Sequence, residues 1–312
     1  FWAGRTVMVT GGAGFLGSHL VEELHERSDD VEVFVPRSEE YDLRRESAVR
    51  RAFADSGADV LVHLAATVEG VGGLEARPGE QFYDNAMMGI RLLEGARRAG
   101  VDAATVAGTA LSYPAGASVP YHESELFDGY PEEAGAPYGV AKRALVAQAR
   151  AYRRQWGFDS SHAVLTNLYG PRDDFDPETA GVVPANIRKC IRARDCGEPS
   201  ITAWGSGEPT RDFLYVRDAA HGILDVTAAE KTGLPVNLGS GTETSIRDLL
   251  EAIASETGFE GAVEWDTAKP EGQDRQRVDI SRAADRFGWQ PETNLAAGLR
   301  RTVEWYEREQ SR

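Results

Sequence analysis

Thr10-Gly11-Gly12-Ala13-Gly14-Phe15-Leu16-Gly17 is the stretch that decides the fold. A β-branched run at 5–10 precedes it, and apolar residues recur at helical spacing from 15 to 24, so the order is strand, tight turn, helix. Glycines spaced as Gly11, Gly14 and Gly17 allow a tight turn, close approach of the backbone to a phosphate, and close packing of helix on strand. We therefore expect this turn to bind the pyrophosphate of a dinucleotide.

Strands and helices alternate through the first half of the chain. Apolar runs predict strands at 31–35, 59–64, 103–108 and 160–166. Helical spacing predicts helices at 46–56, 79–99 and 138–156. This alternation is typical of an α/β fold with a Rossmann-type, doubly wound parallel sheet. The connection at 109–135 is too long for an ordinary loop, and we expect it to cover a site.

The alternation ends near residue 170, where a segment rich in Pro, Gly, Asp and Arg begins. The pattern beyond it predicts helices at 182–194, 245–257 and 295–309, and strands at 236–238 and 263–265. Residues 213–230 again look like core. We expect an NAD(P)-binding domain at 1–169 plus about 212–235, and a smaller C-terminal α/β substrate lobe at about 170–211 and 236–312.

Composition excludes several kinds of partner. A net charge of -16 repels nucleic acid and anionic membranes, so we expect neither as a partner. No apolar run is long enough to span a membrane, and residues 1–5 do not begin a signal peptide. Cys190 and Cys196 lack a redox or zinc spacing, which favours reduced thiols and a cytoplasmic location. The acidic run at 173–176 lacks a coordinating spacing, so we expect no metal.

Tyr138 and Lys142, in Ala136-Pro137-Tyr138-Gly139-Val140-Ala141-Lys142, are the candidate catalytic residues. Their i, i+4 spacing places phenol and ammonium on one face of a helix. A free phenol has a pKa of about 10, but a nearby ammonium and an oxidised nicotinamide both favour the phenolate. Tyr138 could then move a proton near neutral pH, which makes hydroxyl oxidation and ketone reduction accessible.

The end of the second predicted strand bears on the choice of cofactor. A carboxylate at this point of a Rossmann site binds the adenosine ribose, whereas an arginine accommodates a 2′-phosphate. The strand ends Val35-Pro36-Arg37-Ser38, so Arg37 favours NADP over NAD. Glu39 and Glu40 follow directly and keep NAD as an alternative.

These motifs together resemble the extended short-chain dehydrogenase/reductase family, and in particular its GDP-L-fucose synthase group of nucleotide-sugar epimerase-reductases. The resemblance covers nearly the whole chain and includes Thr166-Asn167-Leu168-Tyr169-Gly170-Pro171 and Trp204-Gly205-Ser206-Gly207. Further matching stretches lie at 11–17, 63–66, 82–85, 137–142, 175–178, 211–216 and 237–241. The family implies a nucleotide-diphosphate sugar as substrate, and a homodimer formed through the helices at 79–99 and 138–156.

The resemblance also implies the roles of individual residues. Thr109 would join Tyr138 and Lys142 in catalysis by binding the sugar oxygen at the reacting carbon, with Ser112 a weaker candidate. The implied cofactor ligands are Gly11, Gly14, Phe15, Leu16, Gly17, Arg37, Asp42, Leu43, Leu64, Ala65, Ala66, Tyr138, Lys142 and Asn167. The implied substrate ligands are Thr109, Asn167, Arg188, Lys189, Trp204, Arg211 and Arg275, with Arg192, Arg194 and Arg277 as spare cations.

Two departures from the family pattern limit the expected chemistry. Fucose synthases carry a cysteine and a histidine that epimerise C3 and C5 of the sugar, and these positions hold Leu111 and Gly181 here. Neither side chain can exchange a proton, so we expect epimerisation to be lost or altered and hydride transfer at C4 to remain. A 4-keto-sugar reductase and a 4-epimerase both fit, and a non-catalytic dinucleotide-binding protein is a third hypothesis. Ala110 and Leu111 also exclude the acid and base of a 4,6-dehydratase.

Overall fold

Six strands form a parallel sheet in the larger half of the molecule. The computed structural model describes residues 1–67, 77–229, 233–269 and 272–311. The strands are β1 (Thr6–Thr10), β2 (Glu32–Phe34), β3 (Val60–His63), β4 (Ala103–Thr109), β5 (Ser160–Leu165) and β10 (Pro235–Leu238). They lie in the order β10-β5-β4-β3-β1-β2, with every neighbouring pair parallel. This arrangement confirms the predicted Rossmann-type fold.

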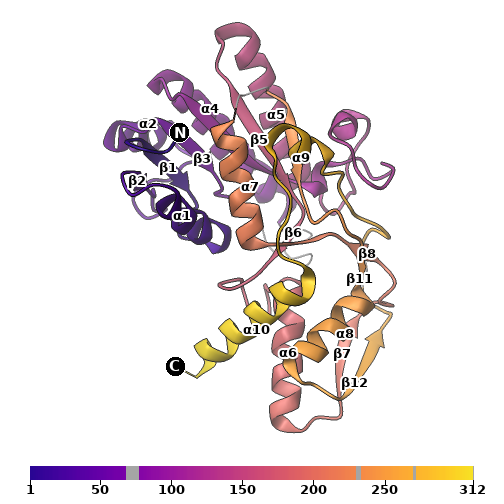
Figure 1. Cartoon of the computed structure of the whole chain (residues 1–312). Helices are drawn as coiled ribbons and strands as arrows, with labels where there is room; N and C mark the ends of the chain where they lie inside the picture. Colours follow the sequence, from indigo (N-terminus) through magenta and orange to yellow (C-terminus); the bar gives the residue numbers. More distant parts are fainter. Residues whose placement is uncertain (68–76, 230–232, 270–271, 312) are drawn as a thin grey trace.

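Helices cover both faces of this sheet (Figure 1). One face carries α1 (Phe15–Arg27) and α7 (Val216–Ala228), and the other carries α2 (Glu46–Ser56), α4 (Pro78–Ala99) and α5 (Ala136–Trp156). The residues of β1 show why the sheet needs a helix layer on each face. Val7 and Val9 are buried on the α1 side, and Met8 between them is buried on the α2 side. A strand that is apolar on both faces requires a helix layer on each.

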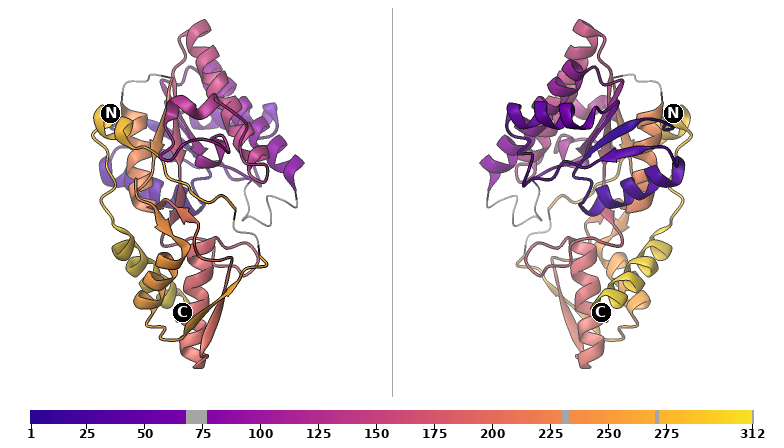
Figure 2. Two further views of the ribbon diagram at one scale, coloured as in Figure 1. Left: turned by 90° about the vertical axis from the view of Figure 1, so that its right-hand side faces the viewer. Right: turned by 90° about the vertical axis from the view of Figure 1, so that its left-hand side faces the viewer.

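The smaller lobe has a core of its own. It contains α6 (Val182–Cys196), α8 (Ile246–Thr257) and α10 (Leu295–Gln310), and a two-stranded parallel sheet of β7 (Ser200–Trp204) and β12 (Ala262–Asp266). Ile187, Leu250 and Val303, one from each helix, are buried in this core. Figures 1 and 2 show the lobe beyond one end of the sheet, joined to it by extended segments that include β6 (Asn167–Tyr169) and β9 (Phe213–Tyr215).

One strand lies in a different place from the one expected. Residues 236–238 were expected in the smaller lobe, but β10 is the edge strand of the large sheet, with Asn237 opposite Val164. The helix α9 (Ser281–Phe287) also packs on β10 and α7. Strand pairing depends on which segments meet in space, so a four-residue apolar run could not reveal its partner.

The connection between β4 and α5 is an ordered excursion, called here the covering segment (residues 110–135). It contains the short 3-10 helices η1 (Ala110–Ser112) and η2 (Glu123–Phe127), and it doubles back so that Ala115 N donates to Tyr130 O at 3.0 Å. The start of η2 covers the open edge of β10, because Asn237 N donates to Glu123 Oε1 at 3.0 Å. Sealing an edge strand in this way prevents pairing with another chain.

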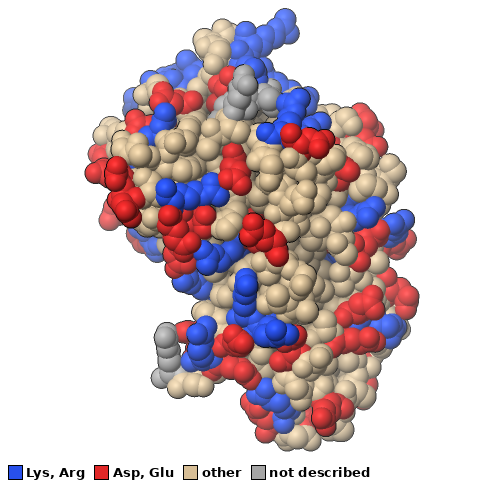
Figure 3. All heavy atoms as spheres, in the orientation of Figure 1, with Lys and Arg blue, Asp and Glu red and all other residues tan. Residues whose placement is uncertain are grey.

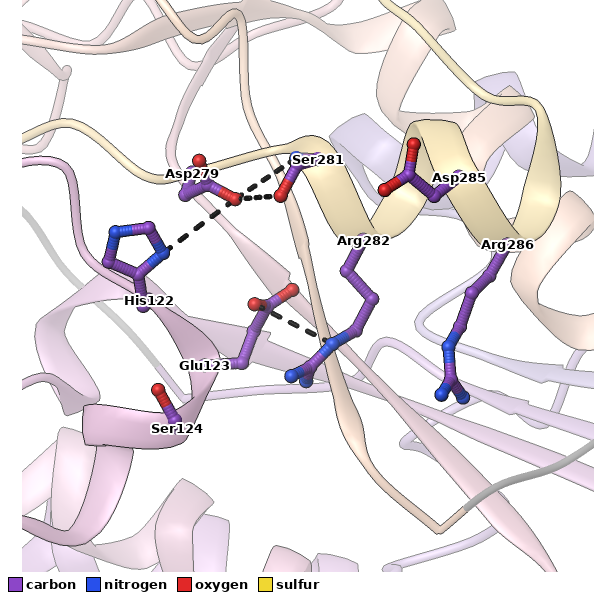
Figure 4. A pocket seen from close by; sticks show the side chains of 8 residues that line it. All are labelled: His122, Glu123, Ser124, Asp279, Ser281, Arg282, Asp285 and Arg286. Atoms are coloured by element: carbon purple, nitrogen blue, oxygen red, sulfur yellow. Dashed lines mark hydrogen bonds and ion pairs between the residues drawn. The ribbon is translucent and has the colours of Figure 1, made fainter.

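A shallow polar pocket of about 280 Å³ lies where η2 faces α9 (Figure 4). Arg282 of α9 reaches across it to Glu123, with Nε 3.7 Å from Oε2. His122 and Asp279 face each other at its rim, with Nδ1 3.8 Å from Oδ1. These contacts attach the covering segment to the chain beyond β10, and none of the residues expected at the active site lines this pocket.

Charged side chains of both signs cover the face of the molecule that Figure 3 shows, where acidic and basic residues are interspersed. Among the described residues, no helix combines the length and the apolar character that crossing a membrane requires.

Candidate active site

The glycine turn after β1 fits a pyrophosphate. Gly11 has φ +72°, and a Cβ there would lie 2.8 Å from Ala65 N, so only glycine is accommodated. A Cβ on Gly17 would overlap Gly11 O, which is why α1 can start so close to the turn. Among the described residues, a Cβ on Gly14 would meet only Gly11 O, at 3.3 Å, and no side chain caps the N-terminus of α1. An uncapped helix N-terminus behind open backbone is a binding site for phosphate.

This turn lies at the point of the sheet where the strand order reverses, between β1 and β3. Ligands of doubly wound proteins bind at such a point, beyond the carboxyl ends of the strands. Here Thr10 Oγ1 lies 2.8 Å from His63 Nδ1, and Ala65 N donates to Thr10 Oγ1 at 3.3 Å. Leu64, Ala65 and Ala66 follow directly and are half-buried, as expected for residues that border a cofactor.

Tyr138 and Lys142 lie in the first turns of α5 and contact each other. The Lys142 Nζ atom lies 5.5 Å from the centre of the Tyr138 ring. Lys142 is 2% exposed and Tyr138 is 8% exposed. Burial lowers the pKa of Lys142 to about 8, so the ammonium is still mostly protonated at pH 7. Burial raises the pKa of Tyr138, so without a cofactor the phenol keeps its proton at neutral pH. Burial therefore opposes the expected bias toward phenolate and favours the protonated phenol.

Two buried histidines near Lys142 were not anticipated as part of the site. His63 on β3 and His162 on β5 both lie opposite Val106 of β4, so the three side chains form a row across one face of the sheet. Burial and the charge of Lys142 lower the pKa of both rings, that of His162 to about 3, so both are neutral. A histidine inside an apolar strand was the available signal in the sequence.

Thr109 ends β4 and begins η1. Its Oγ1 accepts a hydrogen bond from Leu111 N at 3.2 Å, so its own proton remains available to donate. Ser112 is different, since its buried hydroxyl donates to Gly139 O at 3.0 Å. Ser112 therefore serves to attach η1 to α5.

The two positions that depart from the family pattern lie in different lobes. Leu111 belongs to η1, and its side chain lies against Gly135, where a Cβ would be 3.3 Å from Leu111 Cδ2. Gly181 caps α6 with φ −67°, a conformation that any residue adopts. The nearest atom to a Cβ at Gly181 is Pro184 Cδ, at 4.0 Å, so the structure does not require glycine there.

Three of the implied substrate ligands converge where β6 and the short strand β8 (Thr210–Arg211) meet the chain at 273–276. Asn167 Nδ2 donates to Gln276 Oε1 at 2.8 Å, and Arg211 Nη1 donates to Gln273 O at 2.6 Å. Arg275 forms an ion pair with Glu243 and holds the pKa of that carboxyl at about 2. All three side chains are thus held by defined partners in or next to the segment 273–276.

The remaining implied substrate ligands lie on the smaller lobe. Lys189 Nζ donates to Thr202 O at 2.8 Å, two residues from Trp204, whose ring is 57% exposed. Arg188, the residue before Lys189 on α6, lies near enough to Tyr306 on α10 for its charge to lower the pKa of that phenol, although burial raises it overall. Lys189 and Trp204 therefore lie near each other, whereas Arg188 is directed toward the helix layer.

The implied adenosine end of the cofactor site follows β2. The side chain of Arg37 is 56% exposed, and its Nε lies 4.0 Å from Glu39 Oε2. Asp42 is paired with Arg44 and Arg45, and hydrogen bonding from Arg44 lowers its pKa. Leu43 is buried in the same core cluster as Tyr41 and Phe53.

The family of this chain follows from its matches to known proteins. Residues 7–239 match the model of the NAD dependent epimerase/dehydratase family, so the chain belongs to that family and is an NAD(P)-dependent enzyme. It is 35% identical over 301 residues to a GDP-L-fucose synthase of Sinorhizobium fredii, with 96% of this chain and 95% of that one covered. It is 34% identical to a GDP-L-fucose synthase of Escherichia coli, with 99% and 98% covered. A GDP-L-fucose synthetase from Naegleria fowleri bound to NADP superposes with a TM-score of 0.87 at 25% identity, covering 100% of this chain and 96% of that one.

Proposed function

We propose that this protein is an NADPH-dependent reductase that converts the C4 ketone of a GDP-linked 4-keto sugar to an alcohol without epimerising C3 or C5. The main support for this proposal is a contrast between two pairs of residues. Tyr138 and Lys142 are buried together at the start of α5, whereas Leu111 and Gly181 occupy the two proton-exchanging positions of the family pattern. The GDP-L-fucose synthases to which the chain is similar support a GDP-sugar as substrate.

Tyr138 is the proton donor to the C4 oxygen in this proposal. The glycine turn would hold the pyrophosphate of NADPH, and the bound cofactor would supply the hydride. Burial keeps the phenol protonated, so Tyr138 can donate to the oxygen as negative charge develops on it. The ammonium of Lys142 stabilises the phenolate that this transfer leaves behind. The available proton of Thr109 would orient the same oxygen from the other side.

Loss of epimerisation follows from what Leu111 and Gly181 lack. Epimerising a carbon beside a ketone needs one group to remove a proton and another to return it. Leucine and glycine provide neither. A larger side chain would fit at Gly181, so packing does not explain the missing acid or base there.

The preference for NADPH rests on Arg37. Its exposed guanidinium directly follows the strand whose end meets the adenosine ribose in this fold, and it can pair with a 2′-phosphate. The NADP in the Naegleria fowleri relative agrees with this choice.

The diphosphate of the substrate needs local cations because the chain as a whole is acidic, with a net charge of -16. Arg211 and Arg275 supply them beside Asn167, and Lys189 and Trp204 of the smaller lobe extend the same site toward the nucleotide. A cytoplasmic location is part of the proposal, since Cys190 and Cys196 are both free thiols.

The test mixes the enzyme with NADPH and GDP-4-keto-6-deoxymannose in D2O, follows NADPH absorbance, and reads the product by NMR. We expect stoichiometric loss of NADPH and no deuterium at C3 or C5. Deuterium at either carbon would contradict the loss of epimerisation. If NADPH is not consumed but a UDP- or GDP-hexose is interconverted at C4, the enzyme is a 4-epimerase instead.

We also propose a homodimer formed through α4 and α5. These helices pack side by side, and they expose Phe82, Tyr83, Ile90 and Trp156, which are 38% to 56% accessible. Exposed apolar side chains on adjacent helices are typical of a protein interface. Light scattering should give twice the chain mass of 33.9 kDa, and Ile90→Glu should shift it toward the monomer. A monomeric mass for the unaltered protein would refute the dimer.

A further inference from the structure

Thr109 and Tyr138 come from different segments, so their spacing depends on how η1 rests on α5. The contact is close: a Cβ on Gly139 would overlap Leu111 O, and Ser112 Oγ donates to Gly139 O. Any shift of η1 along or away from α5 therefore moves Thr109 relative to Tyr138.

Arg143 is the longest side chain in this contact. It lies on α5 one residue after Lys142, and it is only 9% exposed. Its Nε donates to Ser112 O at 2.5 Å, and its Nη1 donates to Gly129 O at 2.6 Å. One guanidinium thus joins both legs of the covering segment, the leg that leaves Thr109 and the leg that returns to Tyr138.

The charge of Arg143 has no carboxylate partner within the described part of the chain. Its Nη2 is buried without a hydrogen-bond acceptor, and its nearest aromatic contact is Phe127, with the ring centre 6.0 Å from Cζ. A buried, unpaired charge is costly, and a neutral amide could satisfy one of the two carbonyls. Only a planar guanidinium can serve both at their fixed separation.

We propose that Arg143 is a positioning residue for the reaction at C4, and that it sets the spacing of Thr109 and Tyr138 by holding both legs of the covering segment on α5. The inference rests on the proposed function, since it assigns Arg143 to the geometry of that reaction. It predicts a loss in the chemical step that is separable from cofactor binding, because the glycine turn lies on another part of the sheet.

The test compares Arg143→Met and Arg143→Lys with the unaltered enzyme. We expect Arg143→Met to lower kcat about 10- to 100-fold, because displacing reacting groups by about 1 Å has effects of that size. The NADPH dissociation constant should stay within about twofold, and millimolar methylguanidinium should restore part of kcat. Arg143→Lys should lie between the two. Arg150→Met is the control, since Arg150 is an exposed residue of α5 whose guanidinium lies over the same Phe127, at 5.0 Å.

Full kcat in a folded Arg143→Met enzyme would overturn the inference, as would a loss that methylguanidinium does not reverse. If Arg143→Met and Arg143→Lys both fail to fold, Gly139→Ala tests the spacing of Thr109 and Tyr138 instead. Its new Cβ would overlap Leu111 O and so displace η1 from α5, while Arg143 stays in place. Unchanged kcat in Gly139→Ala would then overturn it. All assays use the GDP-4-keto sugar or hexose that the unaltered enzyme converts. Failure of the unaltered enzyme on every such substrate would refute the proposed function, and full activity of the variants would refute only the role of Arg143.

Discussion

The two halves of this active site are held by the fold in different ways. Tyr138 and Lys142, the residues proposed to serve reduction, are buried and in contact at the start of one helix. Leu111 and Gly181, which occupy the epimerisation positions, lie in different lobes, and Gly181 borders open space. In the proposed function, reduction therefore depends on buried packing, whereas epimerisation depends on the side chains present at positions 111 and 181. A site built in this way can lose the second activity without disturbing the first.

Removing the phenol proton of the reducing half should have the largest effect. Tyr138→Phe should lower kcat about 10³-fold or more, because a general acid contributes factors of this order. Titration of NADPH fluorescence should show an unchanged dissociation constant, since the phenol adds little to cofactor affinity in this proposal. Turnover at the rate of the unaltered enzyme would mean that another group donates the proton.

Burial of Lys142 should cost stability, with a defined pH dependence. Its folded pKa of about 8 lies below the ordinary 10.5, so the unfolded chain binds more protons between these values and stability rises with pH across that window. Lys142→Met should therefore be more stable than the unaltered apoprotein by about 3 kcal/mol below pH 8, with the difference shrinking toward pH 10. Urea unfolding at pH 7 and pH 9.5 measures this, with the exposed Lys269→Met as control. A constant difference across pH would show that Lys142 is not desolvated.

Arg37 tests whether the reducing half is matched to NADPH. Arg37→Ala should weaken NADPH binding about tenfold, the value of one exposed charge-assisted pair, and leave NADH binding unchanged. Binding of each cofactor is measured by fluorescence titration, and NADH is the internal control. If Arg37→Ala weakens the binding of NADPH and NADH equally, Arg37 does not bind the 2′-phosphate.

Restoring the missing side chains should have the smallest effect and the most direct bearing on the comparison. In D2O, the double variant Leu111→Cys with Gly181→His should incorporate about a few per cent of deuterium at C3 or C5 of the product. A thiol and an imidazole can exchange protons, but they give weak general acid–base catalysis where the surroundings have not adjusted their pKa values. Each single variant is the control, and neither should exchange. A double variant that reduces the ketone but never exchanges would mean that backbone placement, too, has departed from an epimerising site.

Local elements were predictable because their signals are local. The glycine spacing forces the turn between β1 and α1, and the i, i+4 spacing places Tyr138 over Lys142 wherever α5 lies. Alternating apolar segments required a parallel sheet with two helix layers. The sequence could not predict that β10 belongs to that sheet, because this depends on hydrogen bonds of Asn237 to distant residues. Asn237 N donates to Glu123 Oε1, and the Tyr113 hydroxyl donates to Asn237 Oδ1 at 2.6 Å.

The sequence by itself determined the chemistry available to this protein, because side-chain identity at 111, 138, 142 and 181 states which groups can move a proton and which cannot. Tertiary structure alone decided the protonation states and the spacing. Desolvation of Tyr138 and Lys142 arises from segments distant in the chain, and so does the bridge from Arg143 to Ser112 and Gly129. Such long-range contacts have no periodicity in the sequence, because they depend on which surfaces the folded elements bring together.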